Sequence, residues 1–205
     1  MLKDLTLKEY LEKTASGEAT PGGGSIAALC AAAAAGLTEM VAKLTIGKKS
    51  YESVEVEMKD VADTVSDYRE KLIRAIDEDP AAYNQVMTAY KMPQSTETEA
   101  RDRNQAIQDG LKNAALVPMG VAQDAFQIMA LAKKAITMGN KNAATDGLVA
   151  VMTARTAALA ALYNVKINLE SITDSVFVKT LSQKTSSLEK QVREREKEIL
   201  TAAQF

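Results

Sequence analysis

The sequence of 205 residues contains no histidine and no tryptophan, and it has one cysteine, Cys30. Without histidine, a Ser-His-Asp triad, an imidazole general base and a histidine metal site are all excluded. Acid–base chemistry therefore has to come from Asp, Glu, Lys, Tyr or Cys. A lone cysteine permits no internal disulfide, and its position among alanines predicts a small core residue rather than a reactive thiol.

Neither sign of charge dominates, since 25 Lys and Arg stand against 27 Asp and Glu. The two signs are interleaved, which predicts neither a nucleic-acid groove nor attraction to an anionic membrane. The start, MLKDLTLKEYLEK, does not resemble a cleavable signal. The uncharged window 19–38 is long enough to span a bilayer, but Pro21 and three glycines predict that its helical part is too short. We therefore expect a cytoplasmic protein without a membrane partner.

Apolar residues make up 46% of the chain, enough for a sizeable core, and they recur at helical spacing. We expect helices over 54–76, 80–92, 106–138, 147–165 and 186–203. Asp79 and Pro80 are expected to open the second helix as its N-cap and first residue. Pro118 should kink the third, and Gly139 with Asn140 should end it. With no convincing hairpin signal, this pattern predicts an all-α, antiparallel multi-helix bundle, as a single domain over 1–205.

Two segments, the alanine run 27–35 and the helix 147–165, are built from small apolar residues. Short side chains let helices approach closely, so these segments belong inside a bundle or at a subunit contact. A homodimer would help to bury them, although packing within one subunit would do the same.

Three successive glycines, Gly22, Gly23 and Gly24, precede Ser25 and the alanine run. They satisfy a loose G-x-G-x-x-A, but no strand precedes them and no Gly-Lys-Ser/Thr closes a phosphate loop, which argues against a nucleotide site. Two interpretations remain. One is a tight turn with Ser25 as the helix N-cap; the other is a row of backbone N–H groups that holds an anion such as a carboxylate.

Several polar residues lie at or near the ends of predicted helices. Lys48 and Lys49 are either a solvated helix end or a site for an acidic ligand tail. Asp79 and Asp146 are either helix caps or carboxylates perturbed by apolar neighbours.

Asn164 and Asn168 are four residues apart and share a helix face. Amides on an apolar stretch need partners, which are either backbone groups or a ring-bearing ligand.

Taken together, the segments TPGGGSIAAL, TIGKKSY, DEDPAAYNQVMTAYKMP, GNKNAATDGLVAV and YNVKINL resemble the cyclodeaminase/cyclohydrolase family of folate enzymes. The resemblance extends from about Leu5 to Thr173. It implies an all-helical homodimer that acts on a tetrahydrofolate derivative without a metal or redox cofactor.

The resemblance implies one of two reactions. We favour hydrolysis of 5,10-methenyltetrahydrofolate to 10-formyltetrahydrofolate, because the chain contains no formiminotransferase domain. Ring closure of 5-formiminotetrahydrofolate with release of ammonia, a cyclodeaminase reaction, is the alternative. A non-catalytic folate-binding or interaction module is the alternative from another class.

The motif matches also suggest roles. Asp146 is our first candidate for the catalytic carboxylate and Asp79 the second. We hypothesise that Lys48, Lys49 and the amides from Gly22 to Ser25 bind the glutamyl tail, that Asn140, Asn164 and Asn168 face the pterin, and that Tyr83 keeps a packing or stacking role.

Overall fold

The structure, a computed structural model, describes residues 1–202 and contains helices but no strand within that range. The elements are the 3-10 helix η1 (Leu2–Asp4), α1 (Leu7–Thr14), α2 (Gly23–Lys43), the 3-10 helix η2 (Lys49–Val54), α3 (Glu55–Tyr90), α4 (Glu97–Met138), the 3-10 helix η3 (Lys141–Ala143), α5 (Ala144–Leu169) and α6 (Ser175–Ala202). The predicted all-α class is confirmed. Of the predicted helix 186–203, the last residue lies outside the described residues, as do residues 204 and 205 of the predicted domain.

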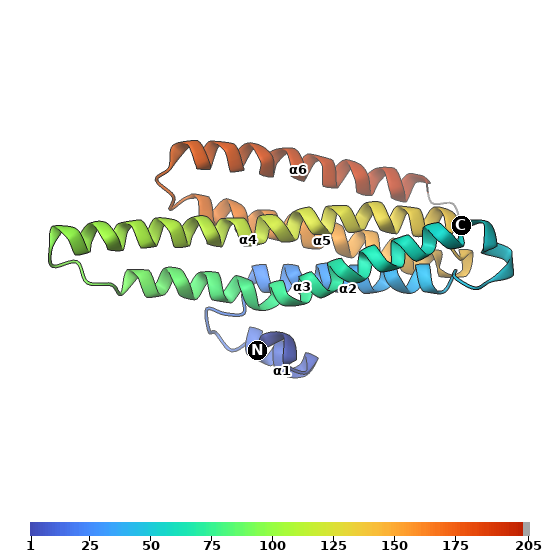
Figure 1. The fold of residues 1–205 in the computed structure, drawn as a ribbon, viewed down its shortest axis with the longest axis horizontal. Coiled ribbons are helices and arrows are strands. Elements are labelled where there is room, and N and C mark those ends of the chain that lie inside the picture. Colours follow the sequence, from blue (N-terminus) through green and yellow to red (C-terminus); the bar gives the residue numbers. More distant parts are fainter. Residues whose placement is uncertain (203–205) are drawn as a thin grey trace.

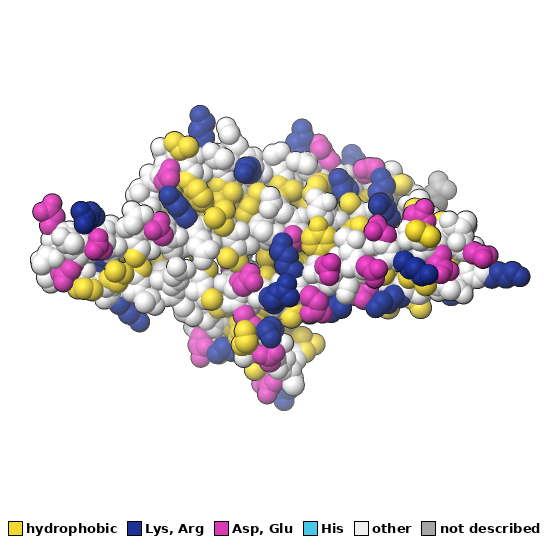
Figure 2. Space-filling model, viewed as in Figure 1, with side chains coloured by type: hydrophobic (Ala, Val, Ile, Leu, Met, Phe, Trp, Pro, Cys, Tyr) yellow, Lys and Arg dark blue, Asp and Glu magenta, His cyan; other side chains and the backbone are white. Residues whose placement is uncertain are grey.

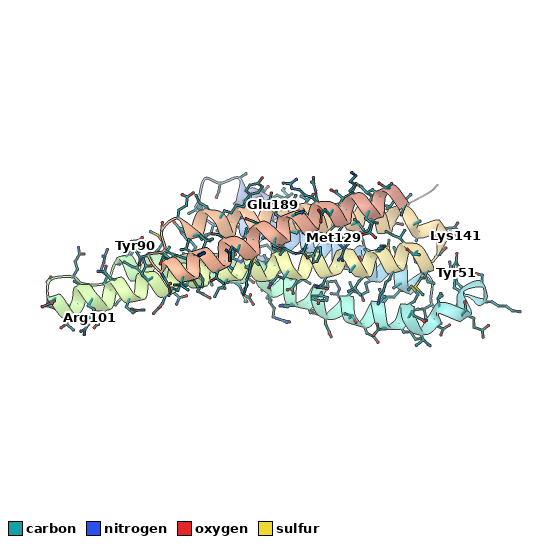
Figure 3. All side chains as sticks on the ribbon, turned by 90° about the horizontal axis from the view of Figure 1, so that it is seen from above. Tyr51, Tyr90, Arg101, Met129, Lys141 and Glu189 are labelled. Carbon is teal, nitrogen blue, oxygen red and sulfur yellow. The ribbon has the colours of Figure 1, made fainter. Side chains whose placement is uncertain are left out.

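Four long helices, α2 to α5, form the bundle, and α6 lies along α4 and α5 (Figure 1). α2 packs against α3, α4 and α5, and the side chains that it buries are mostly alanine. Such short side chains allow the close backbone approach that the sequence predicted. The α3–α4 hairpin, which carries Tyr90 and Arg101, extends past the other helices at one end of the molecule (Figure 3).

The two long hairpin helices run through their prolines, so the predicted break at Pro80 was wrong. α3 continues from Glu55 to Tyr90, and Asp79 lies inside it rather than capping a new helix. A proline removes one helix hydrogen bond and leaves the carbonyl four residues earlier without its donor. In α3 that carbonyl belongs to Ile76, and it accepts a hydrogen bond from the Ser25 hydroxyl of α2 at 2.8 Å.

The same repair occurs at Pro118 in α4. The carbonyl that this proline frees belongs to Ala114, and it accepts a hydrogen bond from the Asn168 side chain of α5 at 2.7 Å. A helix-internal proline costs about 3 kcal/mol. A side chain from a neighbouring helix offsets part of that cost, and no local sequence pattern reveals such a partner.

The expectation that the helix in 19–38 would be too short to span a bilayer was also wrong. α2 spans 21 residues, from Gly23 to Lys43, and so extends past that window. By length and composition, three helices are apolar enough to cross a membrane: α2, α4 and the segment Lys141–Leu169. The apolar windows of these helices are 61%, 61% and 56% buried inside the bundle, respectively. The face seen in Figure 2 carries charges of both signs along α3 and α6.

Candidate active site

The glycine triplet forms the start of α2. Gly22 is the N-cap residue and Gly23 the first helical residue, so the expectation that Ser25 caps this helix was wrong. Ser25 is the third helical residue and is fully buried. Because glycine has no side chain, Gly22 cannot satisfy the first backbone N–H groups of the helix, which leaves them for water, another part of the chain or a ligand.

A carboxyl group from α3 lies against this helix start. A Cβ atom built on Gly24 would lie only 1.9 Å from Oδ1 of Asp79 and 2.4 Å from its Cγ. Only glycine therefore admits Asp79 at this position. Burial raises the pKa of the half-buried Asp79 carboxyl, and a backbone hydrogen bond from Ser25 offsets part of that rise.

Two more of the predicted residues are near Asp79. A Cβ atom on Gly23 would lie 3.2 Å from Nδ2 of Asn164, which places this amide of α5 beside the glycine turn. Tyr83 is one turn beyond Asp79 on the same face of α3, and 41% of it is exposed. We call the group Gly22–Ser25, Asp79, Tyr83 and Asn164 the Asp79 end of the bundle.

The two asparagines of α5 already have hydrogen-bond acceptors within the fold. Asn164 donates through Nδ2 to the carbonyl of Ala160 at 2.9 Å. Asn168 donates to the carbonyl of Ala114 that Pro118 leaves free. We expected either backbone groups or a ring-bearing ligand as partners of these amides, and both amides donate to backbone carbonyls in the structure.

The remaining predicted residues lie at the opposite end of α2 and α5. Asn140 is buried, and its Nδ2 donates to the Leu44 carbonyl while its Oδ1 accepts from the Asn142 amide. Asn140 therefore fastens the α4–α5 connection to the C-terminus of α2. The hydroxyl of Tyr51 accepts from the Lys141 amide at 3.0 Å, and these two residues are seen together in Figure 3.

Lys48 and Lys49 are exposed at the start of η2, directly after α2. Asp146 is in the first turn of α5 and is half-buried. A carboxylate in a first turn is favourable to the helix dipole, so the capping interpretation stays open for Asp146. We call the group Lys48, Lys49, Asn140 and Asp146 the Asp146 end.

The two candidate carboxylates are far apart within one chain. From Asp146 to Asn164 the chain advances 18 residues along α5, about 27 Å at 1.5 Å per residue. Asn164 lies beside Gly23, the neighbour of the glycine that contacts Asp79. The sequence motifs therefore map to two ends of the bundle rather than to one cluster.

Sequence reasoning missed Tyr10 altogether. This residue of α1 is 4% exposed, and its hydroxyl oxygen lies 2.8 Å from the Ser25 hydroxyl oxygen. Burial raises the pKa of the Tyr10 phenol, with the nearby Asp79 carboxylate acting in the same direction. One signal was available, since Tyr10 is the aromatic residue of a short helix whose other apolar residues are Leu7 and Leu11.

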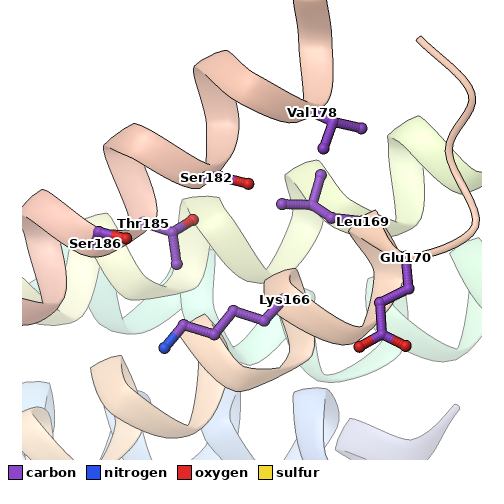
Figure 4. A pocket seen from close by; sticks show the side chains of 7 residues that line it. All are labelled: Lys166, Leu169, Glu170, Val178, Ser182, Thr185 and Ser186. Atoms are coloured by element: carbon purple, nitrogen blue, oxygen red, sulfur yellow. The ribbon is translucent and has the colours of Figure 1, made fainter. Parts of the chain in front are cut away.

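A cleft of about 350 Å³ lies between the end of α5 and α6 (Figure 4). Its lining includes Lys166, Glu170 and Ser182 but none of the predicted site residues. The Lys166 ammonium is bound to Glu189 at 2.6 Å. Within residues 1–202, no three His, Cys, Asp or Glu side chains are grouped to hold a metal ion.

Comparison with known proteins gives one consistent family. Residues 6–187 match the family model described as formiminotransferase-cyclodeaminase. The chain is 37% identical to a methenyltetrahydrofolate cyclohydrolase of Methylorubrum extorquens, over 84% of this chain and 83% of that protein. It is 31% identical to the formimidoyltransferase-cyclodeaminase of Rattus norvegicus, over 91% of this chain but only 35% of that longer protein.

A solved structure is also similar. The crystal structure of a formiminotetrahydrofolate cyclodeaminase from Thermotoga maritima superposes with a TM-score of 0.86 and 34% sequence identity. The match covers 97% of this chain and 96% of that one.

Proposed function

Since this chain belongs to the formiminotransferase-cyclodeaminase family, we propose that it hydrolyses 5,10-methenyltetrahydrofolate to 10-formyltetrahydrofolate. Its relatives are named for two reactions, methenyltetrahydrofolate cyclohydrolysis and formiminotetrahydrofolate cyclodeamination, and the chain is an enzyme of this pair. We prefer the hydrolase because its match spans 83% of the named protein, whereas the rat enzyme is matched over about a third of its length.

Cyclodeamination is the second candidate, and the similarity to the Thermotoga structure along nearly the whole chain supports it. In that reaction N10 attacks the formimino carbon and loses its proton, the formimino nitrogen gains two protons, one to replace that from N10 and one from solution in net terms, and ammonia leaves to give the 5,10-methenyl cation. Hydrolysis and cyclodeamination both pass through a tetrahedral carbon between two nitrogens. One arrangement of proton donor and acceptor therefore serves either reaction.

The observation that carries the proposal is the half-buried Asp79 carboxyl at the glycine turn. In hydrolysis, water adds to the carbon that bridges N5 and N10, and a base removes one of its protons. The bond between N5 and this carbon then breaks, N5 gains a proton and the hydroxyl proton leaves, so one proton is released overall. We assign the base, and the acid that protonates N5, to Asp79. These steps need only water and proton transfers, so we propose no metal or redox cofactor.

A raised pKa suits Asp79 to this work. A carboxyl with an ordinary pKa is a weak base and is almost entirely ionised at neutral pH. Burial raises the pKa of Asp79, which makes its carboxylate a stronger base than that of an exposed aspartate. The neighbouring Asn164 amide and the exposed Tyr83 ring are placed to border the folate rings, the first as a polar contact and the second as a stacking surface.

We also propose that the chain works as a homodimer, through the outer surfaces of α2 and α5. α2 has no charged residue from Gly23 to Thr38, and its outward residue Met40 is 37% exposed. On α5, Met152, Tyr163 and Ile167 are 42%, 59% and 60% exposed. Exposed apolar side chains on two adjacent helices favour burial against a partner. A second copy is the occupant that we propose.

A two-fold axis that crosses the helices would place the Asp79 end of one copy against the Asp146 end of the other. In this arrangement Asp146, Lys48 and Lys49 of the second copy complete the site around Asp79. The lysines would then meet the anionic glutamyl tail while the pterin lies at the glycine turn. Within one chain, the two ends of the bundle are about 27 Å, or about five helix turns, apart along α5. In an antiparallel dimer, residues from both ends can still contribute to one folate site.

The activity is tested with two substrates and the purified chain, after subtraction of the spontaneous rates. With 5,10-methenyltetrahydrofolate, the cyclohydrolase consumes the methenyl chromophore. With 5-formiminotetrahydrofolate, a cyclodeaminase produces that chromophore together with ammonia. Turnover in the second assay alone would replace our assignment by the alternative, and no turnover in either assay would favour a binding module.

The shared site is tested by mixing two inactive variants, Asp79→Asn and Asp146→Asn, under conditions that exchange subunits. At a one-to-one ratio half of the dimers are mixed, and in each of these one of the two sites keeps both carboxylates. Activity should recover to about a quarter of the wild-type value per chain. If both carboxylates act within one chain, no mixture recovers activity.

A further inference from the structure

We call the segment 76–79 of α3 the Asp79 turn. The hydroxyls of Ser25 and Tyr10 form a pair beside it. Ser25 is fully buried and Tyr10 is 4% exposed, and their oxygens are 2.8 Å apart. The Ser25 hydroxyl also lies 2.8 Å from the Ile76 carbonyl, whose helix donor Pro80 removes. These contacts link α1, α2 and α3 at the point where Pro80 removes one backbone hydrogen bond from α3.

The donors in this pair follow from counting protons. A serine hydroxyl has one proton to donate, and the Ile76 carbonyl accepts it because a carbonyl has no proton of its own. The Ser25 oxygen must then accept from Tyr10, so the phenol is the donor in that contact. The order is Tyr10 to Ser25 to Ile76, and each group uses its only hydroxyl proton.

Ser25 touches the Asp79 turn twice. Its hydroxyl donates to the carbonyl of Ile76, three residues before Asp79, and its backbone amide faces the Asp79 carboxyl and lowers that group's pKa. Ser25 therefore acts on α3 both at Ile76 and at the Asp79 carboxyl. The carboxyl occupies the space that a side chain at residue 24 would fill.

The N-terminal segment holds the same turn at another point. The Leu2 amide donates to Oδ1 of Asp77 at 2.6 Å. This contact joins η1 directly to the segment 76–79, whereas the Tyr10 phenol of α1 reaches that segment through Ser25. Packing of apolar surface alone would not require a hydroxyl at residue 10, whereas the carbonyl that Pro80 leaves free needs a donor, and Ser25 accepts from Tyr10 while it donates to that carbonyl.

We propose that Tyr10 and Ser25 are positioning residues for Asp79. Ser25 supplies the donor that Pro80 removes from α3, Tyr10 donates in turn to the Ser25 oxygen, and the two thereby hold the carboxyl against Gly24 at the start of α2. This inference rests on the proposed function only in its effect on turnover, because the placement of Asp79 is measurable without substrate.

The test compares Ser25→Ala and Tyr10→Phe with the wild type. NMR of the aspartate carboxyl carbons follows the titration of Asp79, whose signal is identified by its absence from Asp79→Asn. In Ser25→Ala the carboxyl gains access to water, so its pKa should fall toward the ordinary value. We expect kcat to fall about tenfold with KM within twofold, which corresponds to 1.4 kcal/mol in the barrier. Tyr10→Phe keeps the ring and should shift both readings in the same direction by less.

The matched control is Val65→Ala, which removes a fully buried side chain of α3 about four turns before Asp79. It should lower the melting temperature without moving the Asp79 titration. If Ser25→Ala and Tyr10→Phe lower only the melting temperature, or leave the titration unchanged, the positioning role is wrong. If Ser25→Ala fails to fold, Tyr10→Phe decides the question alone. A shifted titration together with a fully active Asp79→Asn would instead refute the catalytic role of Asp79 and keep the positioning role.

Discussion

Replacing Gly24 by alanine tests the placement of Asp79 with one added methyl group. That methyl would lie 1.9 Å from Oδ1 and 2.4 Å from Cγ of Asp79. Ordinary contacts begin near 3.4 Å, so the carboxyl has to move by about 1.5 Å. A displacement of about 1 Å in a catalytic group costs roughly 100-fold in rate, or about 2.7 kcal/mol. We expect kcat of Gly24→Ala to fall by that factor.

Measuring the thermal stability of Gly24→Ala shows whether a lower kcat comes from the displaced carboxyl or from partial unfolding. Alanine is favoured over glycine inside a helix by about 1 kcal/mol, so the new residue is not intrinsically destabilising. The matched control is Gly120→Ala in α4, where no atom lies within 4 Å of the added methyl. That variant should gain stability and keep full activity. The assay is steady-state turnover of 5,10-methenyltetrahydrofolate, with thermal unfolding of both variants.

The carboxyl should also titrate differently in Gly24→Ala. A displaced Asp79 is better hydrated, and its pKa should fall toward the ordinary aspartate value. Turnover and titration near the wild-type values in a folded Gly24→Ala protein would refute the reasoning, because they would show that Asp79 does not need its place over Gly24.

Three other substitutions test separate parts of the structure. In Asp79→Asn we expect a higher free energy of unfolding than in the wild type at neutral pH, and no difference below about pH 4. The reason is that a raised folded-state pKa costs stability as pH rises through the aspartate range. Urea unfolding measures this, and a difference that is the same at all pH values would contradict it. Asn168→Ala should lower the free energy of unfolding by about 1–3 kcal/mol. In a Pro118→Ala background the loss should be smaller, because the backbone N–H of the new alanine reaches the Ala114 carbonyl. Equal losses of stability in the two backgrounds would show that the Asn168 amide does not serve this carbonyl. Asp146→Asn should lower kcat at least 100-fold if this carboxylate acts in the reaction, and near-wild-type turnover would leave it as a helix cap.

Helix positions could be predicted from the sequence because helical periodicity is a local property. The stripe from Val65 to Ile76 does lie in α3, Val54 is the N-cap of that helix, and the end of α4 at Gly139 is as predicted. The same local reasoning wrongly predicted that a helix ends before Pro80, within what is the continuous helix α3. Whether a proline ends a helix depends on whether some other residue satisfies the freed carbonyl, and here that residue, Ser25, is 51 positions away in the chain.

The candidate site could be predicted in its residues but not in its geometry. The glycine triplet, Asp79 and Asn164 were each recognised from sequence, and the structure places them together. Asp146 was recognised in the same way and lies at the other end of α5. Which helix ends meet depends on the direction and register of packing, which motifs along one chain do not encode. Tyr10 escaped notice because its role exists only through Ser25.

The direction of the Asp79 pKa shift favours one of two roles that the sequence could not separate. A carboxylate that serves as a helix cap accepts backbone N–H groups and benefits from the helix dipole, so its pKa falls. At the start of α2 the Ser25 amide acts in that direction, but burial acts more strongly and the pKa of Asp79 rises. The site therefore holds this carboxyl where its ionised form is destabilised, which costs stability above the aspartate range. This direction is the one that we expect for the base proposed above, which takes a proton from water and returns one to N5, and it is opposite to the direction expected for a cap.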